Sequence, residues 1–342
     1  MDDNYSGGLS HTEITGVKAF CFTKTRHYKP YSWSFFRDLY PFLYFCIMKF
    51  KFFPVLLLIL ATPVFAQMSS LRGQIESYIS TKKATVGIGI YDLETGDTLT
   101  IGGAGHYPMQ SIYKFHLALA ILSDADSKKR TLEDKIFIRM KDLDKETFSP
   151  MYDKNPKGNY SMPLAELLRY AVSESDNNAC DILFRIYGGP KKLEQYIKSL
   201  GIDDISIKAT ENQMHGPFKV QYTNWTTPYA AILLLKKFYR DNILSKTSTD
   251  FLLDLMTNTN NYADRLKAGL PADATLAHKT GTSGTNKGMR AAQNDIGIVS
   301  LPNGKHYAIA AFVSNSYESF EANSKTIADI SRLVWKYFNG QR

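Results

Sequence analysis

The sequence predicts an α+β fold with two lobes: an antiparallel five-stranded sheet formed by both chain ends and flanked by helices, and an all-α lobe between them. Three observations support this prediction. Apolar residues alternate, as in strands, both before residue 102 and after residue 275. Helical periodicity dominates from residue 107 to about residue 239. The composition, 44% hydrophobic and 22% charged, is typical of a globular chain that buries a sizeable core.

The sheet lobe is assigned to residues of about 67–105 and 260–342. It is expected to begin with a helix near 71–80 and a hairpin. The hairpin is indicated by ATVGIGIYDLETGDTLTIGG, in which apolar and small residues alternate on both sides of a turn at 94–97. The other predicted elements are strands at 275–282, 294–301 and 306–314, the last two joined by a turn at 302–304, and a final amphipathic helix at 320–338.

The helical lobe is assigned to residues of about 106–259, with helices expected near 111–122, 163–173, 179–187, 191–200 and 228–238. Residues 202–225 show neither the helical nor the strand periodicity of apolar residues, so we expect a long loop. A long loop inside a compact domain is commonly functional. Two lobes of different architecture leave a cleft between them, which is a common position for a small-molecule site.

The N-terminal region carries an export signal. In MKFKFFPVLLLILATPVFAQ, residues 48–67, two lysines precede an apolar run that ends in a small residue suited to cleavage before Gln67, so the signal would cover residues 48–66. The run is too short to span a bilayer, so we expect a cleaved signal peptide and a periplasmic protein without stable membrane association. Residues 1–47 precede this signal and lack periodicity. We expect that they reflect a mis-chosen start codon; a genuine extension or an uncleaved anchor is the alternative.

Charge and cysteine content exclude several classes of protein. The whole chain has a net charge of +8, and the part after residue 66 holds 34 basic and 29 acidic residues, a net charge of about +5. These basic residues are scattered, so we expect a solvated surface and no nucleic-acid partner. Only Cys180 follows the signal, so no internal disulfide is expected; its apolar helical context favours a buried hydrophobe over a nucleophile. The histidines show no metal-ligand spacing, so neither metal nor cofactor is expected.

A polar tetrad, Ser111-Ile112-Tyr113-Lys114, opens an otherwise apolar helix. Residues three apart lie on one face of a helix, and the helix N-terminus favours a developing negative charge. A serine hydroxyl becomes a nucleophile when a base accepts its proton, and a desolvated lysine can be that base. The tetrad alone is also compatible with a capping serine and a solvated lysine.

Two further motifs follow in order: Ser175-Asp176-Asn177 at a junction between predicted helices, and Lys279-Thr280-Gly281 in a predicted strand. Each alone is typical of a turn or an edge strand. Together with the tetrad they occur once each, at intervals that fill one domain. In these motifs the chain resembles the penicilloyl-serine transferases, and specifically the class A serine β-lactamases. The resemblance covers roughly residues 68–340.

This resemblance implies hydrolysis of the β-lactam amide through a covalent acyl-serine intermediate, and hence β-lactam resistance. Ser111 would attack the lactam carbonyl, and either Lys114 or Glu211 acting through a water would accept its proton. Ser175 would relay a proton to the leaving nitrogen beside Lys279. Glu211, in the unassigned loop, takes the place of the Ω-loop glutamate that activates the deacylating water. Transpeptidases lack that glutamate.

The resemblance also implies a set of substrate-binding residues. These are Asn177, Lys279, Thr280, Gly281, Thr282, Phe148 and His215. Asn177 would bind the substrate side-chain amide, and Thr280 and Thr282 its carboxylate. The backbone N–H groups of Ser111 and Thr282 would form an oxyanion hole. Phe148 would line the cleft mouth, with simple packing as the alternative.

Several positions depart from the common class A pattern. His215 stands where the family usually has asparagine beside the deacylating water. Ala209 and Asn224 replace an arginine and an aspartate that pair across the loop neck, so we expect a loosened loop and a roomier cleft. The cation that anchors the substrate carboxylate is either Arg290 or Lys287.

These departures resemble the cephalosporinase and extended-spectrum branch, so we expect a monomer that favours cephalosporins, accepts penicillins and has small-molecule β-lactams as its partners. One alternative is a penicillin-binding DD-peptidase of the same superfamily, which would deacylate slowly. Another is a covalent β-lactam sensor domain, which would need a retained membrane anchor.

Overall fold

A computed structural model describes residues 68–259 and 263–340. The predicted signal peptide, residues 48–66, and the segment 1–47 lie outside these residues, so both interpretations stay predictions. In the described part of the chain, no helix is both long and apolar enough to cross a bilayer.

The main sheet confirms the prediction that both chain ends pair. Its strand order is β2-β1-β11-β10-β8, and neighbours along this path are antiparallel. The strands are β1 (Thr85–Asp92), β2 (Thr98–Ile101), β8 (Thr275–Thr282), β10 (Met289–Ser300) and β11 (His306–Ser316). A sixth, short strand that was not predicted, β9 (Thr285–Asn286), pairs with β10. The strand with Lys279-Thr280-Gly281, β8, is therefore at the edge of the five-strand path.

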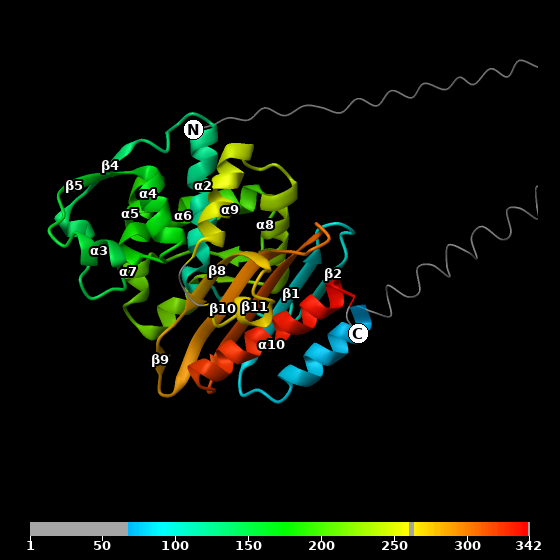
Figure 1. The fold of residues 1–342 in the computed structure, drawn as a ribbon. Coiled ribbons are helices and arrows are strands. Elements are labelled where there is room, and N and C mark those ends of the chain that lie inside the picture. Colours follow the sequence, from blue (N-terminus) through cyan, green and yellow to red (C-terminus); the bar gives the residue numbers. More distant parts are fainter. Residues whose placement is uncertain (1–67, 260–262, 341–342) are drawn as a thin grey trace, which may run out of the picture. The chain divides into compact units, whose positions relative to one another are not determined.

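Each face of the sheet is covered by its own hydrophobic core. On one face a helix over residues 68–79 and α10 (Phe320–Phe338) pack together, as Figure 1 shows in blue and red. Apolar residues of these two helices, among them Leu71, Ile75, Ile327 and Val334, join the sheet residues Ile88 and Ile309 in this core. The second, larger core lies between the opposite face and the helical lobe. The sheet is thus buried on both faces.

The helical lobe contains most of the remaining α-helices. Its helices are α2 (Tyr113–Asp126), α3 (Pro150–Lys154), α4 (Leu164–Val172), α5 (Asn177–Tyr187), α6 (Pro190–Ser199), α7 (Glu211–Met214), α8 (Pro228–Arg240) and α9 (Lys246–Thr257). Most match predicted segments; α3, α7 and α9 were not predicted. Within the described residues, α2 is buried on nearly all sides, which explains its continuous apolar sequence.

This lobe is not purely helical as expected. It also carries two small antiparallel sheets, β4 (Lys135–Ile138) with β5 (Tyr160–Pro163), and β3 (Tyr107–Pro108), β7 (Trp225–Thr226) and β6 (Ile205–Ser206) in the order β3-β7-β6. The second sheet joins the segment that precedes Ser111 to both ends of the loop that carries Glu211. Backbone pairing therefore connects the two parts of the candidate site.

Candidate active site

Ser111 lies in a 3-10 turn, η2 (Gln110–Ile112), directly before α2, and not in the first turn of an α-helix as predicted. Neither η2 nor α2 has a side-chain cap, so the capping interpretation of Ser111 is wrong. The preceding Gln110 has a φ of 50° and donates a hydrogen bond to Gln221 Oε1 at 3.1 Å. A left-handed non-glycine residue is strained, and such strain is often found at functional sites.

Lys114 is 1% exposed and is surrounded by acceptors. Its Nζ donates to Asn177 Oδ1 at 2.6 Å and to the Ser175 carbonyl oxygen at 2.7 Å, and forms an ion pair with Glu211 Oε1 at 3.0 Å. A lysine ammonium has three N–H donors. These three contacts account for all of them.

Glu211 reaches the same point from a distant part of the sequence. Ser111 Oγ donates to Glu211 Oε1 at 3.4 Å, which is long for an O–H···O hydrogen bond. Glu211 is the first residue of α7, whose capping box is formed by Thr210 and Gln213. The structure therefore brings Ser111, Lys114 and Glu211 together, as the sequence predicted.

Asp181 of α5 holds the backbone of Glu211 in place. Its carboxylate accepts hydrogen bonds from the backbone N–H groups of Glu211 at 2.7 Å and Asn212 at 2.9 Å. Burial raises the pKa of Asp181, and these backbone donors oppose the rise. Sequence reasoning missed this residue, although it lies one helical turn after Asn177 and so on the same face of α5.

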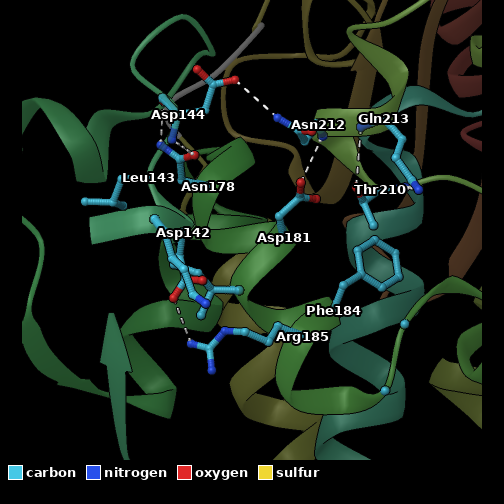
Figure 2. A pocket seen from close by; sticks show the side chains of 14 residues that line it. Asp142, Leu143, Asp144, Asn178, Asp181, Phe184, Arg185, Thr210, Asn212 and Gln213 are labelled. Carbon is cyan, nitrogen blue, oxygen red and sulfur yellow. Dashed lines mark hydrogen bonds and ion pairs between the residues drawn. The ribbon is translucent and has the colours of Figure 1, made fainter. Parts of the chain in front are cut away.

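A hollow of about 640 Å³ is lined by residues of the 141–144 segment, of α5 and of the start of α7 (Figure 2). Asp181, Thr210 and Asn212 form part of its wall, and Asn212 also approaches Asp144 across it. None of the predicted site residues lines this hollow. It is nevertheless bordered by the residues that hold Glu211.

The neck of the loop is closed by Asn224, so the loosened neck that we expected is not supported. Asn224 is fully buried; its Oδ1 accepts from the N–H groups of Lys208 at 2.7 Å and Ala209 at 2.9 Å, and its Nδ2 donates to the Ala209 carbonyl at 2.8 Å. Side-chain-to-backbone hydrogen bonds thus take the place of the aspartate-arginine ion pair that the resemblance would lead us to expect at this neck.

The Ser175-Asp176-Asn177 segment links the two lysines of the site. Ser175 has a φ of 58°, so its carbonyl reaches Lys114 while its Oγ accepts a hydrogen bond from Lys279 Nζ at 2.9 Å. Asp176 is fully buried and caps α5 through the Ala179 N–H at 2.8 Å. It also accepts bonds from the Ser149 hydroxyl and the Met151 N–H. These bonds fix the segment that carries Ser175.

The strand β8 approaches the nucleophile turn closely. A Cβ at Gly281 would lie 2.3 Å from the Met109 carbonyl oxygen, so only glycine allows this contact. Lys279 on the same side of the strand is 3% exposed. Burial and the neighbouring charge of Lys114 lower the pKa of Lys279 to about 7.

Sequence reasoning proposed Arg290 or Lys287 as the cation beside the substrate carboxylate, but the guanidinium that reaches Thr282 belongs to Arg265. Arg265 is fully buried, and its Nη2 donates to Thr282 Oγ1 at 2.6 Å. Arg290 instead donates to the Ser283 carbonyl and packs on the Phe320 ring. Lys287 is exposed on the turn after β9.

The open part of the site is a cleft of about 310 Å³. Its wall includes Gln110, Ser111, Asn177, Glu211, Met214, His215, Gly216, Phe218, Gln221, Thr282, Ser283 and Gly284. Lys114, Ser175, Lys279 and Thr280 are buried beneath it and do not line it. The cleft therefore exposes the hydroxyl of Ser111 while the cationic groups that act on it are shielded from solvent.

Thr147 connects two of the predicted binding residues. Its Oγ1 accepts from Asn177 Nδ2 at 2.8 Å and lies 3.2 Å from His215 Nε2. The adjacent Phe148 is 53% exposed, which does not fit the packing interpretation of this residue. Among the described residues no cluster of three histidine, cysteine or acidic side chains could hold a metal ion. Cys180 is buried, as predicted.

Comparisons with known proteins agree with this fold. A family model described as "Beta-lactamase enzyme family" matches residues 70–338. β-Lactamase VEB-1 of Pseudomonas aeruginosa is 42% identical over 80% of this chain and 92% of its own length. Extended-spectrum β-lactamase PER-1 of the same organism is 40% identical over 80% of this chain and 88% of its own. The crystal structure of TLA-3 extended-spectrum β-lactamase is 50% identical, with a TM-score of 0.78 over 80% of this chain and 99% of that one.

The chain belongs to the class A serine β-lactamases. Its activity is the hydrolysis of β-lactams, and the predicted family and fold class are confirmed.

Proposed function

We propose that hydrolysis proceeds through a covalent acyl intermediate on Ser111, with cephalosporins as the favoured substrates. The contact that carries this proposal is the chain of Ser111 Oγ, Glu211 Oε1 and Lys114 Nζ, at 3.4 Å and 3.0 Å. Catalytic hydrogen bonds in an empty site are often long and shorten when substrate binds, so the 3.4 Å distance is compatible with proton transfer.

We propose Glu211, and not Lys114, as the group that accepts the Ser111 proton. Lys114 Nζ contacts three acceptors, an arrangement that suits an ammonium group with three N–H donors and no lone pair to take the proton. The Glu211 carboxylate faces the hydroxyl directly. Lys114 then stabilises the anionic form of Glu211 and positions Asn177.

For the leaving nitrogen, we propose Ser175 as the proton relay and Lys279 as its electrostatic partner. Lys279 Nζ donates to Ser175 Oγ, so the hydroxyl hydrogen of Ser175 is directed elsewhere and is available to the lactam nitrogen. The backbone N–H groups of Ser111 and Thr282 would hold the carbonyl oxygen; removal of one such donor typically costs about 3 kcal/mol. The Lys279 ammonium returns a proton to Ser175, and Glu211 releases the Ser111 proton to the cleft solvent, from which Lys279 is protonated again. The regenerated Glu211 carboxylate then activates the water that cleaves the ester.

We propose that residues around Ser111, Lys114 and Glu211 recognise the substrate. Asn177 would bind the side-chain amide of the substrate, and Thr280, Gly281 and Thr282 its carboxylate end. Phe148 and His215 would contact the end of its side chain. PER-1 is described as an extended-spectrum enzyme. Phe148 is exposed and its carbonyl accepts a hydrogen bond from the N–H of Asn177, a wall residue of the cleft. We propose the same breadth for this chain, with cephalosporins ahead of penicillins. We also propose export to the periplasm by cleavage after residue 66, and action as a monomer without a stable membrane anchor.

The decisive experiment compares Glu211→Gln with Ser111→Ala in nitrocefin and intact-mass assays. We expect both steps to slow in Glu211→Gln, so that the acyl adduct forms slowly and then persists, and we expect Ser111→Ala to form none. An adduct that forms as fast as in the parent protein and then persists would limit Glu211 to deacylation and overturn its role as the acceptor of the Ser111 proton. The matched control is Glu146→Gln, because Glu146 is an exposed glutamate whose side chain is 79% accessible. Unchanged turnover in Glu211→Gln would exclude its role in both steps.

The same assays separate the alternatives. A DD-peptidase would keep a penicillin bound to Ser111 of the unmodified protein for many minutes. A sensor domain would be recovered from membranes with residues 1–66 still attached, which N-terminal sequencing detects.

A further inference from the structure

A buried histidine and aspartate lie on the reverse face of the strand that carries Lys279. Side chains alternate along β8, so His278, Thr280 and Thr282 point away from the face of Lys279 and Gly281. His278 is 5% exposed and Asp295 of β10 is fully buried. His278 Nδ1 lies 2.9 Å and 3.0 Å from the two carboxylate oxygens of Asp295. The mechanism proposed above uses neither residue.

The pair joins two adjacent strands diagonally. In the register of β8 and β10, Asp295 is opposite Thr280 and Gly297 is opposite His278. The contact between His278 and Asp295 therefore crosses from β8 to β10 beside Thr280. The buried carboxylate of Asp295 needs hydrogen-bond donors to offset its desolvation. With Nδ1 protonated, the ring donates to Asp295 and supplies one of them.

Asp295 also holds the segment that supplies Arg265. Its Oδ2 accepts a hydrogen bond from the Leu266 N–H at 3.2 Å, so the residue next to Arg265 is fixed to the sheet. Arg265 in turn donates to the carbonyls of Gly281 at 3.1 Å and Asn294 at 2.8 Å. Its Nη2 donates to Thr282 Oγ1. One carboxylate thus connects β8, β10 and the arginine.

We propose that His278 and Asp295 form a positioning pair that, from behind β8, holds the carboxylate-binding end of the cleft in the geometry needed for acylation. This proposal rests on the proposed function, which assigns the substrate carboxylate to that end. The pair touches no substrate. It acts through Thr280, Thr282 and Arg265, whose relative positions it restrains.

Asp295 has a second effect through its charge. Lys279 is influenced by the charges of Lys114 and Glu211 on its own side of β8, and by those of Asp295 and Arg265 behind the strand. Among these, the carboxylates of Asp295 and Glu211 favour the ammonium form of Lys279, while the two other cations disfavour it. Removal of the Asp295 charge is therefore expected to lower the pKa of Lys279 further.

The test compares three variants of the full-length protein: His278→Leu, His278→Asn and Asp295→Asn. Asparagine places an N–H donor near the Nδ1 position, and leucine places none. Acylation and deacylation rate constants are measured separately by intact mass with a slowly hydrolysed cephalosporin. We expect acylation to fall about tenfold or more in His278→Leu and to stay within about threefold of the parent in His278→Asn, with deacylation unchanged in both.

For Asp295→Asn, we expect the alkaline limb of the acylation pH profile to move to lower pH by about half a unit or more. A purely structural role would slow acylation and deacylation together and leave this limb in place, which would overturn the proposal. Equal loss in His278→Asn and His278→Leu would overturn it too. If His278→Leu does not fold, the pH profile of Asp295→Asn decides alone, because this substitution keeps the shape of the side chain.

Failure of the proposed function gives a different result. An unmodified protein that does not turn over nitrocefin would refute the hydrolase mechanism. The effect of the pair would still be measured, as the rate of covalent labelling by benzylpenicillin in the same variants.

Discussion

Replacement of Asn224 by alanine removes all three hydrogen bonds that close the neck of the Glu211 loop. Two of them involve Ala209, which is 3% exposed, so its N–H and carbonyl would be left unsatisfied away from water. The third involves the N–H of Lys208, which is exposed and can bond to water instead. At about 1 kcal/mol for a net hydrogen bond and more for a buried orphan, we expect a loss of about 2–4 kcal/mol in the free energy of unfolding.

Urea unfolding measures this loss, and amide hydrogen exchange locates it. We expect faster exchange for residues 206–224 and unchanged exchange for α2. Asn212→Ala is the matched control, because Asn212 is an exposed asparagine of the same loop whose side chain makes only a 3.4 Å contact with Asp144. A loss below about 0.5 kcal/mol in Asn224→Ala, or equal effects in both variants, would refute this account of the neck.

Three further predictions follow from single residues. Because the pKa of Lys279 is lowered to about 7, its ammonium form is lost as pH rises through that value, so kcat/KM should fall above pH 7 and persist to higher pH in Lys279→Arg. Gly281→Ala should cut acylation at least about 100-fold because its Cβ would collide with the Met109 carbonyl, whereas Gly73→Ala, in the N-terminal helix with nothing within 4 Å, should be near neutral. Burial lowers the pKa of His116 to about 4 from 6.5, so the folded state takes up this proton later than the unfolded state does as the solution is acidified. His116→Phe should therefore show less loss of stability between pH 6.5 and pH 4, by up to about 3 kcal/mol, in pH-dependent urea unfolding.

The longer helices and strands were predictable because their apolar residues recur with the period of a helix or of a strand. The alternation in 275–282 and the amphipathic pattern in 320–338 match β8 and α10. By contrast, β3, β6 and β7 have two residues each, which is too short for any period to show. Helix α9 was missed because its first turn contains Thr247, Ser248 and Thr249, which have low helix propensity. Its stability comes instead from packing against β8 and α2.

The motif residues of the site were predictable, and the residues that support them were not. Ser111, Lys114 and Glu211 meet as expected, although they lie up to 100 positions apart. Arg265 carries no local signal, because its partners are 16 to 29 positions away and only the folded sheet brings them together. For the loop neck, the sequence revealed that an ion pair was missing. It did not reveal that an asparagine amide can both accept from and donate to the backbone there.

The exposed rim and the buried interior of the cleft belong to separate structural elements. His215 and Gly216 line the cleft and are exposed on the turn after α7, whereas Lys114, Ser175 and Lys279 are buried and held by hydrogen bonds. Substitutions on such turns rarely change stability by more than about 0.5 kcal/mol. Selection by new antibiotics can therefore vary the rim one residue at a time while the reacting groups keep their arrangement, so drug resistance can broaden without first weakening the fold.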